Sequence, residues 1–426
     1  METHVRIQLG KHGSGERNPG DDEPLLRLKA RRHPPISSGA EERGGDVLRG
    51  LIFCERPARH LRPIGSDRWD EEYVVYRLIA HAEKSASTAR SERPARLPRL
   101  PAPGDFPSMR TVRFLAYASA ACAYLLIVLG GWVRITGSGM GCGDDWPLCN
   151  GHLIPPLNDP ATLIEWGHRL LAAFVGFVVL GLAWAAYRAR GEPGGSGRGS
   201  PFRLVLLAVP LLGLVGLLGR ATVMLELPPS TVIAHLSTAM ALIALLIVIG
   251  LQAGRSLCGG AAPSHPGAWK ATIAAIVLAA AAVLLGGLTA NLGGAGACLG
   301  FPLCNGQLWP AAGPDGLTHI HWTHRLVAYG LTLHLIGMAI AARKRGAPMP
   351  IQRTLWGVLG ITVLQVLVGA AMVLSILQPH WRAFHVAAGT AVWAGVVVLG
   401  WMVKPVREEA AVSVGDARMA ETAQQL

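Results

Sequence analysis

Charged residues are scarce in this chain. Only 15% of its 426 residues are Asp, Glu, Lys or Arg, whereas a soluble globular domain carries about 25%. The deficit argues against a soluble enzyme. The seven cysteines are too few for a disulfide-built scaffold of this length. The net charge of +12 does not indicate nucleic-acid binding, because the basic residues gather in an N-terminal tail and in loops between apolar runs.

Long apolar runs dominate the chain from Phe114 onward. Each has about 17–25 residues, enough to cross about 30 Å of hydrocarbon as a helix. The runs are too long for barrel strands and lack alternating polarity, so we expect an all-α polytopic membrane protein. The expected spans cover approximately 114–133, 164–187, 203–223, 231–251, 271–290, 320–342, 354–374 and 383–403.

Lys and Arg gather in alternate loops, for example at Arg110, Arg188, Arg343 and Lys404. The positive-inside rule makes that side cytoplasmic. Both termini are therefore expected inside a cell (plasma) membrane, and the loops 134–163, 224–230, 291–319 and 375–382 outside.

Residues 1–108 have no sustained apolar period and are rich in disorder-promoting residues. Two interpretations stay open: a disordered basic extension, or a start codon placed too early, with Met109 a natural start. Their many acidic residues argue against a mitochondrial transit peptide. We expect four-helix bundles at 109–254 and 268–405, joined by a cytoplasmic linker at 255–267, and a C-terminal tail at 406–426.

The two halves resemble each other at polar and turn positions. Four-helix units in the same orientation make a parallel repeat, here expected to be pseudo-twofold about an axis near the membrane normal. The matches are Gly130-Gly131 with Gly286-Gly287, Pro147–Gly151 with Pro302–Gly306, Glu165–Leu170 with His321–Leu326, and Gly219, Pro229 and His235 with Gly369, Pro379 and His385.

Four histidines occur as repeat-related pairs inside the spans: His168 with His235, and His324 with His385. Each lies a few residues past the outer start of an even-numbered span, about 5–10 Å deep at 1.5 Å per residue. Ionisable residues in a membrane usually face a bundle interior for a functional reason. Matched imidazoles on two helices suit bis-histidine ligation of a heme. A single such histidine would more often hydrogen-bond a neighbouring helix, and two per half leave a zinc shell incomplete.

Charged and polar residues flank these histidines. Arg169 and Arg325 follow His168 and His324 directly, so either could pair with a heme propionate or snorkel to headgroups. Glu165 lies three residues before His168 on the same helix face, where it could move protons or merely favour a helix N-terminus. Its counterpart is His321, an asymmetry that favours chemistry in the first half. His319, His321 and His334 lack histidine counterparts and are secondary.

The cysteines of the outer loops also pair by position. Cys142 and Cys149 share the first outer loop, and Cys298 and Cys304 share the third. In an oxidising compartment a disulfide in each loop is expected; a structural role and a redox-cycling one both stay open. Cys54, Cys122 and Cys258 have no partner by pattern.

The segment Gly130–Gly139, the loop from Cys142 to Gly151 and the run Glu165-Trp166-Gly167-His168-Arg169 closely resemble the bacterial heme A synthase family, which is related to its mitochondrial counterpart. The resemblance covers about residues 110–405. It implies oxidation of a porphyrin methyl group of heme O to the formyl group of heme A by successive hydroxylations. It also implies heme O between His168 and His235 with Glu165 needed for activity, and heme B between His324 and His385 as an electron relay.

The resemblance further implies partners: heme O synthase upstream, the cytochrome oxidase assembly route downstream, an unidentified electron donor and membrane lipid. Nucleic acid is not expected, and a homo-oligomer stays open. One alternative is a di-heme membrane electron-transfer cytochrome, which shares the histidine pattern but has no need of Glu165. Another is a transporter, which should show broken helices or polar residues at the membrane midplane.

Overall fold

The computed structural model describes residues 107–404, except for 157, 193, 196, 198, 259–265, 312 and 314. The expected N-terminal extension up to residue 106, with Cys54, and the expected tail from residue 406 lie outside this part. Both stay predictions.

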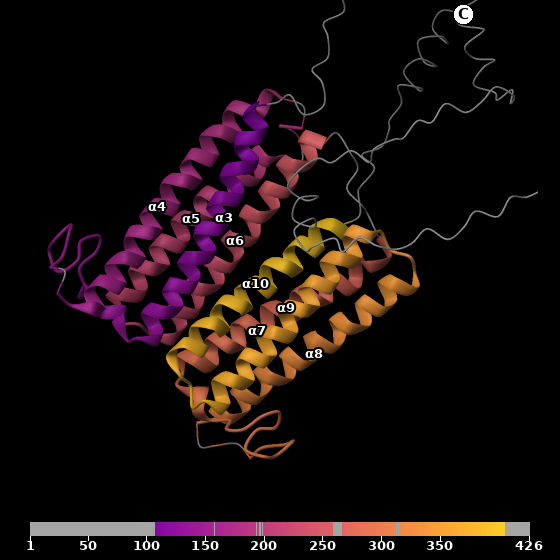
Figure 1. Cartoon of the computed structure of the whole chain (residues 1–426). Coiled ribbons are helices and arrows are strands. Elements are labelled where there is room, and N and C mark those ends of the chain that lie inside the picture. Colours follow the sequence, from indigo (N-terminus) through magenta and orange to yellow (C-terminus); the bar gives the residue numbers. More distant parts are fainter. Residues whose placement is uncertain are drawn as a thin grey trace, which may run out of the picture. The chain divides into compact units, whose positions relative to one another are not determined.

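Eight long helices make up most of the described chain (Figure 1), and all are long and apolar enough to cross a membrane. Among the described residues there is no strand, only isolated bridges from Cys149 to His152 and from Cys304 to Gln307. The all-α architecture with eight membrane-spanning helices is therefore confirmed. The helices are α3 (Pro107–Ile135), α4 (Pro160–Arg188), α5 (Pro201–Met224), α6 (Pro229–Cys258), α7 (Trp269–Asn291), α8 (Leu317–Lys344), α9 (Met349–Leu374) and α10 (Pro379–Val403), with short 3-10 turns η1 (Ser138–Met140), η2 (Ala189–Gly191), η3 (Pro266–Ala268) and η4 (Gly294–Gly296).

Polar caps and prolines define where several helices begin. Asp159 caps α4 by accepting a hydrogen bond from the Thr162 N–H at 2.8 Å, and Ser200 caps α5. Proline occupies the first turn after each cap, where its missing N–H costs nothing. The helices therefore start before the apolar runs do, and each is longer than its predicted span.

The helices pack as two sets of four. In the first set α3 and α5 both pack against α4 and α6, and in the second α7 and α9 both pack against α8 and α10. Figure 1 shows α3–α6 and α7–α10 as two bundles. Aliphatic side chains fill each core, including Leu182 and Leu246 in the first and Leu335 and Leu399 in the second. The exact domain boundaries stay a prediction.

Helix α10 joins the second set to the first through contacts with α3 and α6. The Tyr124 hydroxyl on α3 donates to the Ala387 carbonyl at 2.9 Å. The Trp393 indole N–H donates to the Met240 carbonyl on α6 at 2.8 Å. Buried polar contacts of this kind fix how two apolar helix faces meet.

The α3–α4 and α7–α8 loops are built alike. Each contains a 3-10 turn and a disulfide, Cys142–Cys149 or Cys298–Cys304. Next to the second cysteine of each pair, Asn150 and Asn305 adopt left-handed φ angles of 49° and 52°, which asparagine tolerates well. Their side-chain amides donate to loop carbonyls at 3.1 Å. The same local chemistry thus shapes both loops.

Candidate functional site

His168, His235, His324 and His385 all line one cavity of about 1490 Å³, whose walls are mostly apolar. Small-molecule pockets usually measure about 300–1,000 Å³. The cavity is therefore large enough for a ligand well above that size, or for more than one ligand. The structure places all four histidines predicted from the sequence on its wall.

A glycine on the preceding helix lies against each of these imidazoles. A Cβ atom at Gly130 would lie 2.9 Å from His168 Nε2, and one at Gly286 would lie 2.9 Å from His324 Cε1. Cβ atoms at Gly219 and Gly369 would each lie 3.1 Å from the Cε1 atoms of His235 and His385. Any larger residue would displace the rings. These glycines stood out in the repeat, but their contact with the histidines appears only in three dimensions.

Backbone carbonyls fix the tautomers of two histidines. His235 Nδ1 bonds the Val215 carbonyl at 3.0 Å, and His324 Nδ1 bonds the Ala282 carbonyl at 3.0 Å. Because a carbonyl oxygen only accepts, each Nδ1 carries the proton and each Nε2 keeps a free lone pair. Histidines that bind metals commonly have this arrangement.

The second pair has a spacing that suits one iron atom between its rings. The His324 and His385 ring centroids lie 6.3 Å apart. Two metal–nitrogen bonds of about 2 Å, with about 1 Å from each nitrogen to its ring centre, give about 6 Å. His385 Nε2 lies 3.2 Å from Gln365 Nε2, and its buried Nδ1 has no partner among the described residues. The side chains present therefore fit an iron-containing group that one nitrogen of each ring would hold.

A metal bound by protein groups alone does not fit as well. The described residues contain no cluster of three or more His, Cys, Asp or Glu side chains that could hold an ion. Paired histidines suffice only where the ligand brings the remaining donors itself, as a porphyrin does for iron.

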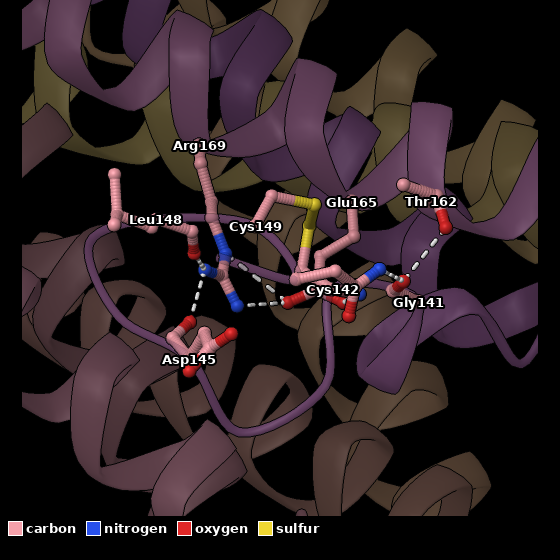
Figure 2. Close-up of polar contacts among 9 residues, drawn as sticks. Gly141, Cys142, Asp145, Leu148, Cys149, Thr162, Glu165 and Arg169 are labelled. Carbon is pink, nitrogen blue, oxygen red and sulfur yellow. Dashed lines mark hydrogen bonds and ion pairs between the residues drawn. A yellow bond between two sulfur atoms is a disulfide. The ribbon is translucent and has the colours of Figure 1, made fainter. Parts of the chain in front are cut away.

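Glu165 lies at the same cavity and is only 4% exposed. Its Oε1 forms an ion pair with Arg169 Nη2 at 2.5 Å, and its Oε2 accepts from the Cys142 N–H at 2.9 Å. The carboxylate therefore connects the helix that carries His168 to the disulfide of the first outer loop (Figure 2).

Arg169 also binds the first outer loop, through two of its backbone carbonyls. Its Nη1 donates to the Asp145 and Leu148 carbonyls, both at 2.6 Å (Figure 2). Gly141 completes the contact, because Thr162 Oγ1 donates to its carbonyl at 2.7 Å and a Cβ there would lie 2.4 Å from the Ala161 carbonyl carbon. Only glycine fits so close to the start of α4.

Arg325 has the matching position at the second loop. Its Nη1 donates to the Gly300 and Leu303 carbonyls at 2.9 and 3.0 Å, and its Nη2 donates to the Cys298 carbonyl at 2.6 Å. His321 replaces the glutamate: its Nδ1 bonds the Gly294 carbonyl at 3.1 Å, and its Nε2 accepts from Arg325 Nε at 3.3 Å. Both ring nitrogens of His321 are occupied, so this imidazole is neutral and has no nitrogen left to exchange a proton.

Arg169 and Arg325 therefore use most of their N–H donors on loop carbonyls and on the side chain one turn earlier, Glu165 or His321. Both still border the cavity, but their predicted pairing with propionates has few N–H groups left to make it. Sequence reasoning missed this use, because the turns that present these carbonyls are not encoded in residue spacing. Of the three secondary histidines, His321 borders the cavity. The other two do not, and they bond backbone carbonyls: His319 to Pro310 at 3.0 Å and His334 to Ala271 at 2.7 Å.

The structure bonds the same cysteines that the sequence pattern paired, Cys142 with Cys149 and Cys298 with Cys304. Cys122 is a free, half-buried thiol. The Cys258 side chain lies outside the described part.

Comparisons with known proteins show which family the chain resembles. Residues 113–397 match the family model COX15-CtaA, described as cytochrome oxidase assembly protein. A heme A synthase of Symbiobacterium thermophilum is 31% identical over 317 residues, which cover 72% of this chain and 100% of the relative. A heme A synthase of Alkalihalophilus pseudofirmus is 33% identical over 54% of this chain and 76% of its own length, and one of Geobacillus kaustophilus is 28% identical over 65% and 86%.

Proposed function

Because this chain belongs to the COX15-CtaA family of cytochrome oxidase assembly proteins, we propose that the histidine-lined cavity is the site of a heme A synthase. The protein is a multi-pass integral membrane enzyme of heme A biosynthesis. The observation that carries the assignment is the set of four cavity histidines, with a buried glutamate beside only one pair.

The substrate is heme O and the product heme A. One porphyrin methyl group is hydroxylated twice to a geminal diol, which loses water to leave the formyl group. The change from methyl to formyl removes four electrons, two in each hydroxylation, and an external oxidant of the class of O2 must accept them. Bound heme iron would supply the redox chemistry of these steps. The protein contributes the ligands, the orientation and the exclusion of water from the cavity.

His168 on α4 and His235 on α6 hold the substrate heme in the first bundle. His324 on α8 and His385 on α10 hold heme B in the second, as a relay for electrons. The free Nε2 lone pairs of His235 and His324, and the 6.3 Å separation of the His324 and His385 rings, support these pairings. The same cavity borders both pairs.

Glu165 is the acid–base residue of the first site. Its carboxylate borders the cavity on the same helix face as His168, three residues away. Oε1 accepts from both Nε and Nη2 of Arg169, whereas Oε2 accepts only from the Cys142 N–H. Oε2 therefore keeps a lone pair with which it can accept a proton from bound substrate or water. His321, with both nitrogens occupied, cannot do this in the second site. This difference supports oxidation in the first bundle and electron relay in the second.

The two bundles form a pseudo-twofold parallel repeat with both termini in the cytoplasm of a plasma-membrane protein. The matched loops, glycine contacts and arginine–carbonyl bonds support the repeat. Arg188, Arg343 and Lys404 lie at the helix ends opposite the disulfide loops, which supports the orientation. Heme O synthase upstream, the oxidase assembly route downstream, an unidentified electron donor and lipid are the proposed partners; a homo-oligomer stays open.

The test is to express the full chain in a host that makes heme O and to identify the bound hemes by extraction and mass. Heme A or its hydroxylated precursor, together with heme B, is the expected result. Glu165→Ala should keep the hemes but stop the oxidation, whereas Asp144→Ala, at an exposed loop carboxylate, should oxidise heme O normally. Heme B beside untouched heme O would instead indicate an electron-transfer cytochrome, and a heme-free protein would rule out the histidine assignment.

A further inference from the structure

The cavity carries an excess of positive charge. Its wall includes five arginines, Arg134, Arg169, Arg220, Arg325 and Arg382, and a single acidic residue, Glu165. Charged groups within membrane spans are expensive and usually have a partner. An unbalanced cationic wall around an apolar cavity therefore indicates an anionic ligand.

Three of the five guanidinium groups have their own contacts. Arg169 pairs with Glu165, and Arg325 donates to loop carbonyls. Arg220 is exposed and lies 5.7 Å from the centre of the Trp146 ring, a cation–π distance. These three do not need a further anion.

Arg134 and Arg382 differ from them. Both are half-buried, and they lie close enough to repel each other. Arg134 donates only its Nε, to Asn291 Oδ1 at 2.7 Å, and its two Nη groups have no described partner. The Arg382 side chain has no hydrogen-bond or ion-pair partner among the described residues. Arg382 also lies in the first turn of α10, where the helix dipole disfavours a cation.

Both arginines lie about one helical turn from the histidine layer, toward the disulfide loops. Arg382 precedes His385 by three residues on α10, and Arg134 follows Gly130, the residue against His168, by four on α3. Spacings of three and four residues share a helix face and amount to about 4.5–6 Å along the axis. A ligand held at the histidines would thus have its outer edge near the two guanidinium groups.

We propose that Arg134, one turn from the contact of Gly130 with His168, and Arg382, one turn before His385, bind propionate carboxylates of the porphyrins held by those histidine pairs. The proposal deepens the heme A synthase function and rests on it. A guanidinium binds a carboxylate through two parallel hydrogen bonds, which cancels the repulsion between the two cations. The propionate edge then faces the disulfide loops, and the opposite edge faces the bundle interior. By fixing the propionate edge, the two arginines determine which porphyrin substituents face the disulfide loops and which face the bundle interior.

A lipid phosphate offers similar chemistry to an arginine near a membrane surface. The porphyrin carboxylate is the better match, because both side chains line the cavity that holds the histidines. The experiment must therefore distinguish a porphyrin carboxylate from a lipid phosphate as the bound anion.

The full chain would be produced in a heme-starved host, purified in detergent and titrated with hemin and with hemin dimethyl ester, whose propionates are uncharged. Arg134→Gln and Arg382→Gln should each weaken hemin binding about tenfold, since each removes a charge-assisted contact. Neither should change the affinity for the ester. Arg382→Lys, which keeps the charge but not the fork, should fall between Arg382→Gln and wild type. The matched control is Arg345→Gln, an exposed residue at the opposite end of α8, which should bind both ligands as wild type does.

Unchanged hemin affinity in both Gln variants would overturn the proposal. So would an equal loss for hemin and the ester, because that pattern reports a distorted fold. Loss of bound phosphatidylglycerol in native mass spectrometry, with hemin affinity intact, would assign the pair to lipid instead. A wild-type protein without a bis-histidine heme spectrum would remove the proposed function itself, whereas a normal spectrum with unaltered variants would remove only the arginine assignment.

Discussion

The glycine beside His324 allows the heme site to be perturbed without touching a ligand. In the Gly286→Ala variant a methyl group would lie 2.9 Å from His324 Cε1 and 3.3 Å from its Nδ1. Carbon atoms in contact prefer about 3.5–4.0 Å, so the ring must move by roughly 0.6–1 Å. The cavity beside it gives it room to do so.

That movement has a calculable cost for ligation. Metal–ligand distances are held to within about 0.2 Å, and the shift also disturbs the hydrogen bond from His324 Nδ1 to the Ala282 carbonyl. Loss of such a supporting contact typically weakens metal binding by about 10–100-fold. We therefore expect heme affinity in the second bundle to fall by that factor, which is about 1.4–2.7 kcal/mol.

The free energy of unfolding of the heme-free Gly286→Ala chain should rise, although its heme affinity falls. Alanine inside a helix is more favourable than glycine by about 0.5–1 kcal/mol. The control is Gly181→Ala in α4, where a Cβ would meet nothing within 4 Å. That variant should gain the same stability and keep wild-type heme affinity. Gly369→Ala, with a contact of 3.1 Å to His385, should weaken binding less than Gly286→Ala does.

The assay is a Soret titration of the heme-free protein, combined with thermal unfolding before heme is added. Weak heme binding by a Gly286→Ala protein that unfolds no earlier than wild type would support the reasoning. If Gly286→Ala binds heme with wild-type affinity, the close approach of helix and imidazole does not govern ligation, and the argument from these glycines fails.

Other contacts give further predictions. Tyr124→Phe removes a hydrogen bond between α3 and α10 and should destabilise the fold by about 0.6 kcal/mol, measured by denaturant unfolding. Cys142→Ser opens a short disulfide loop; it should cost about 2–3 kcal/mol and speed proteolysis of that loop while α4 stays protected. Hydrogen bonds from the Thr162 side chain and then its backbone lower the pKa of Asp159. Its capping contribution should be complete above the ordinary aspartate pKa and be lost as pH falls through the lowered value; Asp159→Asn should flatten this acid dependence in thermal unfolding.

The sequence predicts the number and order of the membrane helices because hydrocarbon thickness sets their length. The apolar runs underestimate how far the helices extend at their N-termini. Asp159-Pro160 and Ser200-Pro201 are polar or turn-forming in composition, yet they cap and begin α4 and α5. A count of apolar residues stops short of them, whereas the rules for helix N-termini would have included them.

The histidine pairs were predictable for a different reason. Their depth follows from counting residues along each span, and the repeat removes the ambiguity of a single buried imidazole. Gly219 and Gly369 were visible in the same repeat, but spacing along one helix does not show what the neighbouring helix brings against it. Their role therefore required the packed bundle.

The contacts of the arginines were the hardest part of the site to predict from the sequence. Arg169 and Arg325 directly follow ligand candidates, which left pairing with a propionate and snorkelling to headgroups both open. Their donors instead reach carbonyls more than twenty residues away in sequence, and those carbonyls are presented by loop turns without a periodic signal. Arg134 and Arg382 come from opposite halves of the chain and occupy no matched positions in the repeat. The sequence predicts that both lie on the outer side, but it does not predict that they border one cavity.

The contacts of each site can form only after the helices that carry them have been synthesised and inserted, so they form in a fixed order. The first disulfide joins residues seven apart and needs no later segment, so it can close while the ribosome is still extending the chain. The bonds from Arg169 must await α4, and the first histidine pair must await α6. The second pair is complete only when α10, the final described helix, has been inserted, and the same helix brings the contacts to α3 and α6. Heme loading of the second bundle must therefore await the insertion of α10, and a nascent chain that stalls before α10 would lack both a ligand and the contacts of that helix with the first bundle.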